Sequence, residues 1–224
     1  MRITPAFTLL VLIASSVATA DVVPVSRTTS LTASWFQADP PFPGSGGSNS
    51  DGTTSLDYYS NTITSGSGSS SQTSYLVTGG AYASASGIGF RNTSVMHPAG
   101  ASGRSTFTYI FDLTSPATLY ITGSLNRGSP FVGYGSIELY DDATNTRVYQ
   151  AAGAAGFEVN TPIADVYAAA AGRYRFVVSG GNDGAGGGAP NGSSSAQAYL
   201  TLPGPGAACP LALGALLTLR RRRA

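Results

Sequence analysis

The amino-acid sequence predicts an all-β fold, an antiparallel two-sheet β-sandwich of jelly-roll type. Apolar and polar residues alternate with a period of two in many short segments, and no segment shows sustained helical periodicity. These segments recur about every 10–15 residues and are separated by stretches rich in Gly, Ser and Asn. Charged residues make up only 10% of the chain and aromatic residues another 10%, a composition typical of an extracellular β protein.

The second half of the chain carries the clearest strand patterns. The residues that we expect to face the core are Phe107, Tyr109, Phe111, Leu119, Ile121, Leu125, Ile137, Leu139, Tyr174, Phe176, Val178, Ala198, Leu200 and Leu202. The same alternation places Tyr120 and Tyr199 on the opposite, outward faces of their strands. The polar run 141–145 predicts the turn of a hairpin that leads into residues 147–150.

The remaining segments have weaker patterns. We expect further strands within residues 31–36, 53–64, 72–77 and 82–90, which gives nine or ten strands in all. We expect long loops over the Gly/Ser-rich residues 39–53, 65–71 and 180–195. The alanine-rich residues 164–171 have helical propensity but are few, so we expect a turn of helix or a loop at a strand edge there.

The N-terminus has the features of a secretory signal peptide. Met1 and Arg2 precede the apolar run 7–13, and small residues then lead to Ala18-Thr19-Ala20. This order predicts a signal peptide over residues 1–20, with cleavage after Ala20. We therefore expect one β-sandwich domain over residues 21–202, followed by a C-terminal segment over residues 203–224.

Charge and cysteine content restrict the partners and the chemistry of the expected domain. Between Asp21 and Gly206 the chain carries seven arginines and eleven carboxylates, a net charge of −4, and it contains no lysine. Nucleic-acid binding needs a basic surface, so we expect no nucleic-acid partner. Cys209 is the only cysteine and lies in the C-terminal segment, so an apolar core and strand pairing must hold the domain without a disulfide.

The C-terminal segment combines a breaker, an apolar run and a basic cluster. Pro203-Gly204-Pro205 precedes an apolar run over Ala207–Leu219, and Arg220, Arg221, Arg222 and Arg223 follow. The run is thirteen residues, about 20 Å as a helix, whereas a spanning helix needs about twenty residues. The arginines would mark the cytoplasmic side of a membrane. A plain tail anchor and a processed sorting signal both fit this pattern.

This layout resembles the PEP-CTERM sorting signal, which an exosortase processes in bacteria that build exopolysaccharide. Gly204 stands where the family's Pro-Glu-Pro signature has glutamate. The resemblance covers about a tenth of the chain, and it implies a membrane sortase as partner, processing near Pro203–Pro205, and delivery to the outer surface or the extracellular matrix. Cys209 could be a lipidation or transfer point, as in short Cys-containing signals, or a small apolar residue among alanines.

Catalytic motifs are absent from the sequence. It contains no nucleophile elbow, dinucleotide fingerprint, phosphate-binding loop or zinc-protease motif, and one histidine and one cysteine are too few for a His/Cys metal site. His97 could be a general base or a surface histidine. Glu138 and Glu158 are the only glutamates, and a glycosidase needs two carboxylates across the sugar. We predict no catalytic residues, with a secreted carboxylate hydrolase as the weakest alternative.

Calcium is the one cofactor that the sequence suggests. Oxygen ligands could come from Asp141, Asp142 and Asn145, or from Asn182 and Asp183 in a Gly-rich stretch. Residues 48–52 also have the Asx-Gly character of a calcium loop. Turn formation by Asx residues explains the same residues without any metal.

Aromatic residues suggest carbohydrate binding. The candidates are Trp35, Tyr58, Tyr59, Tyr134 and Tyr140. Alternating aromatics on strands are more often core residues or cross-strand pairs, so only a row of exposed rings would favour a sugar site. We expect an exported, non-enzymatic protein of the cell envelope or matrix, and a carbohydrate-binding or adhesive module is the alternative.

Overall fold

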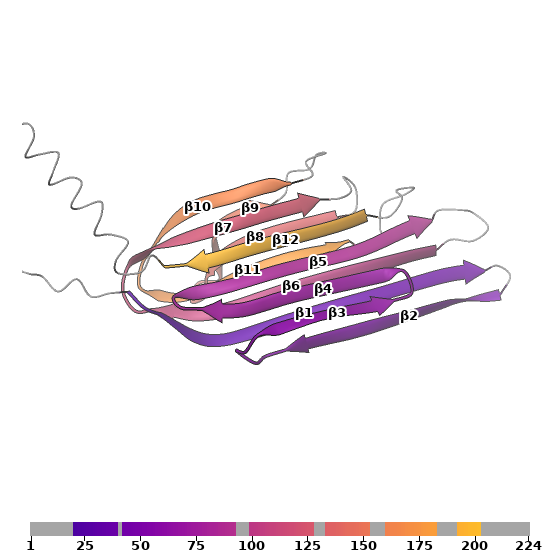
Figure 1. The fold of residues 1–224 in the computed structure, drawn as a ribbon, viewed down its shortest axis with the longest axis horizontal. Helices are drawn as coiled ribbons and strands as arrows, with labels where there is room; N and C mark the ends of the chain where they lie inside the picture. Colours follow the sequence, from indigo (N-terminus) through magenta and orange to yellow (C-terminus); the bar gives the residue numbers. More distant parts are fainter. Residues whose placement is uncertain are drawn as a thin grey trace, which may run out of the picture.

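The computed structural model describes residues 20–39, 42–92, 99–127, 133–152, 160–182 and 192–202, and these residues form twelve strands (Figure 1). The strands are β1 (Val22–Asp39), β2 (Phe42–Thr53), β3 (Tyr59–Ser65), β4 (Gly68–Val77), β5 (Gly80–Asn92), β6 (Ala99–Leu113), β7 (Ala117–Arg127), β8 (Gly133–Asp141), β9 (Thr146–Ala152), β10 (Thr161–Ala169), β11 (Gly172–Asn182) and β12 (Gly192–Thr201). No helix long and apolar enough to cross a membrane occurs within the described ranges.

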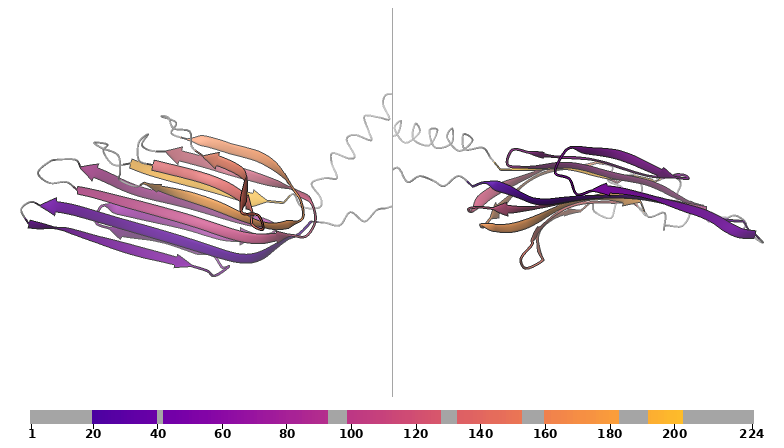
Figure 2. Two further views of the ribbon diagram at one scale, coloured as in Figure 1. Left: turned by 180° about the vertical axis from the view of Figure 1, so that it is seen from behind. Right: turned by 90° about the horizontal axis from the view of Figure 1, so that it is seen from below.

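The strands form two antiparallel sheets of six strands each. Sheet A has the order β2-β1-β6-β11-β8-β9, and sheet B has the order β3-β4-β5-β12-β7-β10. The sheets lie one over the other as two layers (Figure 2). They are joined where Phe90–Asn92, at the end of β5, pairs with Ala99–Ala101 of β6.

The last eight strands have jelly-roll topology, which confirms the predicted fold class. The orders β5-β12-β7-β10 and β6-β11-β8-β9 are those of two interlocked Greek keys, in which successive strands change sheet except at the β8–β9 hairpin. Strands β1 and β2 extend sheet A beyond β6, and β3 and β4 extend sheet B beyond β5. The first and last described residues lie at the same end of the sandwich (Figure 1).

The core lies between the sheets and narrows along the strands. Phe107, Tyr109, Phe111 and Phe176 fill one part with large buried rings. Further along, the core residues of sheet B are alanines, and Gly180 of sheet A faces them so closely that a Cβ there would lie 2.2 Å from the Ala85 carbonyl oxygen. The two sheets therefore approach to backbone contact in this part, where no side chain on sheet A would fit.

Part of the interior is polar. Arg27 on β1 lies opposite Tyr109 on β6 in the strand register, and both side chains are buried. Neither the guanidinium nitrogens nor the Tyr109 hydroxyl has a hydrogen-bond partner among the described residues. On sheet B, the Gln72 Nε2 and Ser74 Oγ atoms are also buried without a partner. Burial lowers the pKa of Arg27, while the Asp57 carboxylate acts in the opposite direction. Unpaired buried polar groups destabilise a fold, so this region opposes the stability that the apolar core supplies.

The predicted core alternation is largely confirmed. Of the fourteen residues expected to face the core, thirteen are buried and Leu202 packs against the core while partly buried. The hairpin predicted around residues 141–145 is also confirmed, as the β8–β9 turn. Alternation succeeds here because each strand has one face on the core and one outside.

Several predictions from glycine and alanine content are wrong. The expected loop over residues 39–53 is mostly β2, the expected loop over 65–71 is a short turn between β3 and β4, and residues 180–182 and 192–195 belong to strands. The expected strand over residues 53–64 is interrupted between β2 and β3, where Ser55 and Asp57 hydrogen-bond to each other. Residues 164–169 form most of the edge strand β10 rather than a helical turn. Pairing with a neighbouring strand outweighs local propensity in β2 and β10, whereas local hydrogen bonds interrupt the strand expected over residues 53–64.

We expect the Tyr109 phenol to make the fold sensitive to alkali. Burial raises the pKa of Tyr109 to about 12, whereas an unfolded tyrosine titrates near pH 10. The unfolded chain therefore loses this proton first, and between about pH 10 and 12 the free energy of unfolding falls by about 1.4 kcal/mol per pH unit. Urea unfolding of Tyr109→Phe should show a shallower loss over this range and no loss of stability at pH 7. Equal slopes for the two proteins would contradict the assignment.

Candidate functional site

The outer face of sheet B carries a row of tyrosines. The ring centroids of Tyr58 and Tyr75 lie 6.1 Å apart, those of Tyr75 and Tyr82 lie 4.8 Å apart, and those of Tyr82 and Tyr199 lie 4.5 Å apart. The interplanar angle increases along the row from 24° to 34° and 42°, as expected in a twisted sheet. We call Tyr58, Tyr75, Tyr82 and Tyr199 the tyrosine row.

Strand register builds this row. Tyr75 on β4 pairs directly with Tyr82 on β5, and Tyr82 pairs with Tyr199 on β12. The residue next to each of them, Leu76, Ala81 or Leu200, packs in the core, so the period of two directs the three rings outward. Tyr120 on β7 is diagonal to Tyr199, because its direct partner is Thr201. Four adjacent strands thus present tyrosine on one face.

Exposure along the row is uneven. Tyr58 is 67% exposed, Tyr120 is 40% exposed and Tyr199 is 37% exposed, while Tyr75 and Tyr82 are half-buried. Neighbouring rings cover part of each other's faces, so mainly ring edges and hydroxyl groups of the row are exposed to solvent. The Tyr58 ring is the most exposed of the four. This surface is rigid because each inner ring is held on two sides.

The face around the row is uncharged and rich in hydroxyl groups. The outward residues of the described strands of sheet B are Ser, Thr, Gln, Asn, Tyr and a few apolar residues, with no Asp, Glu or Arg among them. Gln197 donates a hydrogen bond to the Tyr82 hydroxyl at 2.9 Å. Hydrogen bonding with Tyr199 raises the pKa of Tyr75, and burial raises that of Tyr82, so both phenols stay protonated at neutral pH. The described outward side chains of this face can donate and accept hydrogen bonds but carry no charge.

The comparisons with known proteins do not identify a family. No protein-family model matches the chain, and no curated protein matches its sequence. One solved structure, the crystal structure of infectious bursal disease virus VP2 subviral particle, is similar with a TM-score of 0.30 and 13% sequence identity. The similarity covers 83% of this chain and 58% of the viral chain, so this chain spans less than two thirds of that protein. A similarity with so low a TM-score assigns nothing to this chain.

The five aromatic candidates from the sequence do not lie together. Tyr58 begins the tyrosine row, but Tyr59 turns inward and donates a hydrogen bond to Asp51 at 2.7 Å. Tyr134 and Tyr140 lie on the outer face of sheet A, where Arg104 and Arg175 lie over their rings at 5.8 and 4.7 Å from the centroids. Trp35 lies near the end of β1 that is remote from residue 202.

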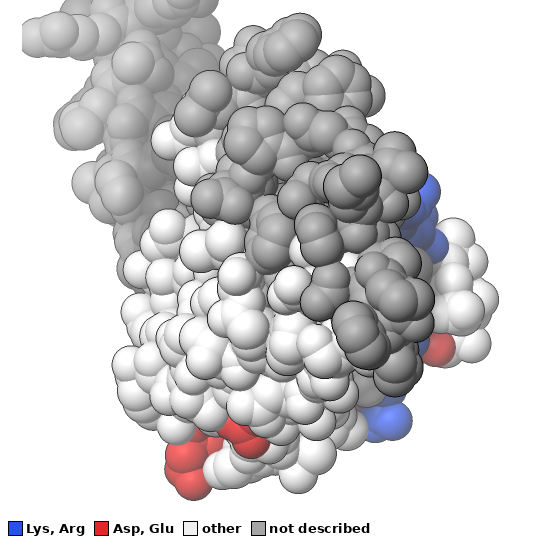
Figure 3. Space-filling view, turned by 90° about the vertical axis from the view of Figure 1, so that its right-hand side faces the viewer, with Lys and Arg blue, Asp and Glu red and all other residues white. Residues whose placement is uncertain are grey.

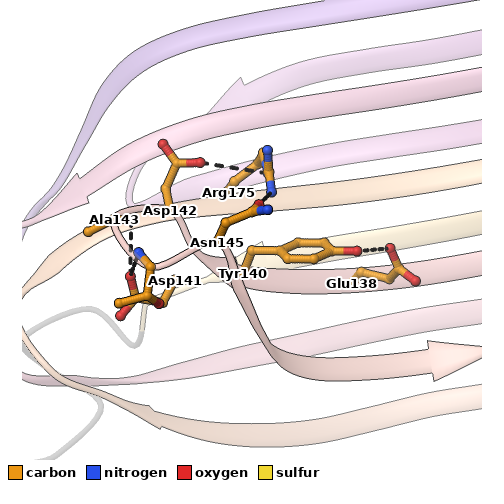
Figure 4. A network of polar contacts seen from close by, with 8 residues as sticks. Glu138, Tyr140, Asp141, Asp142, Ala143, Asn145 and Arg175 are labelled. Carbon is orange, nitrogen blue, oxygen red and sulfur yellow. Dashed lines mark hydrogen bonds and ion pairs between the residues drawn. The ribbon is translucent and has the colours of Figure 1, made fainter.

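The calcium candidates at the β8–β9 turn are engaged in other contacts (Figure 4). Asp141 accepts hydrogen bonds from the backbone N–H groups of Ala143 and Thr144, which is Asx-turn chemistry, and Asp142 pairs with Arg175 at 3.7 Å. Asn145, which has φ 52°, accepts a hydrogen bond from Arg175. Asn182 is buried at the other end of β11, about 25 Å away at the strand rise per residue.

No group of three potential metal ligands occurs within the part of the chain that the structure describes. In the third calcium candidate, residues 48–52, the Asp51 carboxylate accepts hydrogen bonds from Tyr59 and Asn61, and these bonds lower its pKa. Asp183 lies outside the described residues.

The remaining candidates add no further cluster. Glu138 accepts hydrogen bonds from Tyr140 at 2.8 Å and from Arg147 and Gln150 at 3.3 Å each, on the outer face of sheet A. Three side chains thus hold the Glu138 carboxylate in place. His97, Glu158 and residues 1–19 of the signal peptide expected over residues 1–20 lie outside the described residues. So do the sorting-signal residues Pro203–Pro205 and Arg220–Arg223, and Cys209.

Sequence reasoning found the outward tyrosines singly and missed the row. Alternation alone places Tyr120 and Tyr199 outward, and the same signal was available for Tyr75 and Tyr82, which precede Leu76 and Ala83. Alternation does not predict which strands pair. Tyr82 and Tyr199 lie more than a hundred positions apart in the sequence and meet only because β5 pairs with β12.

Proposed function

We propose that this protein is an exported, non-enzymatic module that binds extracellular polysaccharide through the outer face of sheet B. The tyrosine row is the observation that carries the proposal. Sugars combine apolar C–H faces with a dense set of hydroxyls, so a matching protein surface offers aromatic groups among neutral hydrogen-bonding side chains. The outer face of sheet B combines both, and its lack of charge favours a neutral polymer over an acidic or basic one.

The open, extended form of the face suits a polymer better than a small molecule. A small ligand needs a concave site that buries most of its surface, whereas the row lies on an open sheet. Successive strands are about 4.8 Å apart, so four strands give a ligand chain repeated, similar contacts across the sheet. Repetition of weak contacts raises the overall affinity without any deep pocket.

Location is part of the same proposal. The signal-peptide pattern over residues 1–20 and the resemblance of residues 203–224 to an exosortase-processed signal support delivery to the outer surface or matrix. All twelve described strands lie between Val22 and Thr201, before the segment that resembles the sorting signal. Export machinery, the sortase and polysaccharide are the partners that this proposal implies, and it requires no cofactor.

Retention on insoluble polysaccharides tests the proposal. We expect the purified protein to sediment with at least one of cellulose, chitin or isolated bacterial exopolysaccharide, and a glycan array should identify the repeating unit. Tyr58→Ala and Tyr199→Ser should each weaken binding about five- to thirty-fold, because loss of an aromatic contact costs about 1–2 kcal/mol. Binding should be equal in EDTA and in calcium.

Tyr134→Ser is the matched control, because it removes an outward tyrosine from sheet A. This variant should bind as the wild type does. The proposal fails if no polysaccharide retains the protein, or if the Tyr58 and Tyr199 variants bind as tightly as the control. A requirement for calcium would instead point to the Asx residues near Asp141.

A further inference from the structure

A separate hollow lies at the end of the sandwich remote from residues 20 and 202. Its volume is about 210 Å³, and its lining includes Trp35, Phe36 and Gln37 from β1, the β3–β4 turn residues Gly66 and Ser67, and Ala99 from β6. Gln37 pairs with Ala99. The hollow and the tyrosine row lie toward opposite ends of β4, since Gly68 follows the turn and Tyr75 is about 23 Å further along the strand.

Glycines hold the Trp35 indole in place. Period-two alternation puts Trp35 on the same face of β1 as the buried residues Leu31 and Ala33. Gly66 lies directly on the indole, because a Cβ there would be 2.5 Å from the Trp35 Cγ atom, and its φ of +55° also favours glycine. A Cβ at Gly47 would lie 3.0 Å from the indole Nε1. The ring is therefore ordered before any ligand arrives, which reduces the entropic cost of binding.

The lining fits one small, neutral, hydroxylated ring. Drug-sized ligands occupy pockets of about 300–1,000 Å³, so this hollow has room for a smaller molecule. The lining combines the aromatic residue Trp35 with the neutral polar residues Gln37 and Ser67, and no charged residue is among the lining residues. Where described residues are visible at this end, the surface is mostly uncharged and its charged groups lie at the margins (Figure 3).

We propose that this hollow is a second carbohydrate subsite that receives a single neutral sugar ring, such as the end of a polysaccharide chain. This inference rests on the proposed function for its ligand class but uses none of the residues of the tyrosine row. An anionic ligand would lack a basic partner in this lining, and a flat aromatic ligand would leave the amide and hydroxyl groups without partners.

Trp35 makes the subsite directly observable, because it is the only tryptophan in the chain. Titration of the purified protein with neutral monosaccharides and short oligosaccharides should shift the Trp35 emission to shorter wavelength and reduce its quenching by acrylamide, with a saturable dependence on concentration. Ala99→Leu, which fills the hollow, should abolish the change, and Gln37→Ala should weaken binding about ten-fold. Tyr199→Ser should leave the Trp35 response intact.

Different experimental results would refute the subsite and the function proposed for the tyrosine row. If the protein is retained on polysaccharide while no sugar alters Trp35 emission, the subsite is refuted and the tyrosine row stands. If sugars alter Trp35 emission saturably but nothing retains the protein, the subsite stands and the function proposed for the row fails. A sugar response that persists unchanged in Ala99→Leu also refutes the subsite.

Discussion

Replacement of Arg27 by methionine should stabilise the protein, raising the free energy of unfolding by about 1–4 kcal/mol. The Arg27 side chain is 1% exposed, and its Nε, NH1 and NH2 atoms make no hydrogen bond with any described residue. A guanidinium does not lose its proton in proteins, so the fold carries a desolvated charge that the Asp57 carboxylate offsets in part. Methionine keeps most of the volume and removes the charge.

Urea unfolding at pH 7 measures the effect, and Arg173→Met is its control. Arg173 is half-exposed and forms a bidentate pair with Asp112, through bonds of 2.7 and 2.9 Å, on the outer face of sheet A. Loss of an exposed pair of this kind should cost about 0–1 kcal/mol. The two arginine substitutions should therefore have opposite signs. A destabilised Arg27→Met would mean that the guanidinium has an effective partner in solution.

Gly180→Ala should have the opposite consequence, a loss of about 3 kcal/mol, at the upper end of what overpacking costs. In an ordinary strand, alanine is preferred over glycine by about 0.5–1 kcal/mol. At Gly180 the added Cβ would lie 2.2 Å from the Ala85 carbonyl oxygen and 3.2 Å from the Ala196 amide nitrogen, both of them backbone atoms of sheet B. Removing this steric overlap requires the two sheets to move apart, and this movement would loosen the packing of the adjacent core.

Gly135→Ala provides a graded comparison. Gly135 also faces sheet B, but a Cβ there would lie 3.0 Å from the Ser195 carbonyl oxygen, so a small shift suffices. Thermal unfolding should show a much larger fall in Tm for Gly180→Ala than for Gly135→Ala. Equal falls, or a rise for Gly180→Ala, would mean that the sheets are further apart in solution than the close contact at Gly180 indicates.

Local pattern accounts for much of the fold but little of the site. Phe107, Tyr109 and Phe111 could be assigned to the core from alternation alone, because hydrophobic burial on one face of a strand is a local signal. Strand β2 could not, since its Gly/Ser sequence has no apolar face and its strand conformation depends on the ladder with β1. The burial of Arg27 could not be predicted either, because a charged residue ordinarily lies on the outward face of a strand.

The candidate site depends on register, which composition does not encode. Tyr82 and Tyr199 come together only because β5 and β12 are paired, and the hollow at Trp35 exists only because the β3–β4 turn ends beside β1. Both features are produced by contacts between distant segments. A sequence can therefore indicate the kinds of side chain available for sugar binding, while the topology decides which of them meet.

The position of Tyr199 on β12 has a mechanical consequence. Tyr199 lies three residues before Leu202, and β12 is hydrogen-bonded along both sides, to β5 and to β7. If the chain is held beyond residue 202 and a polymer pulls on Tyr199, the force enters and leaves β12 within its last few residues. Most of the remaining sandwich stays outside the path of the force.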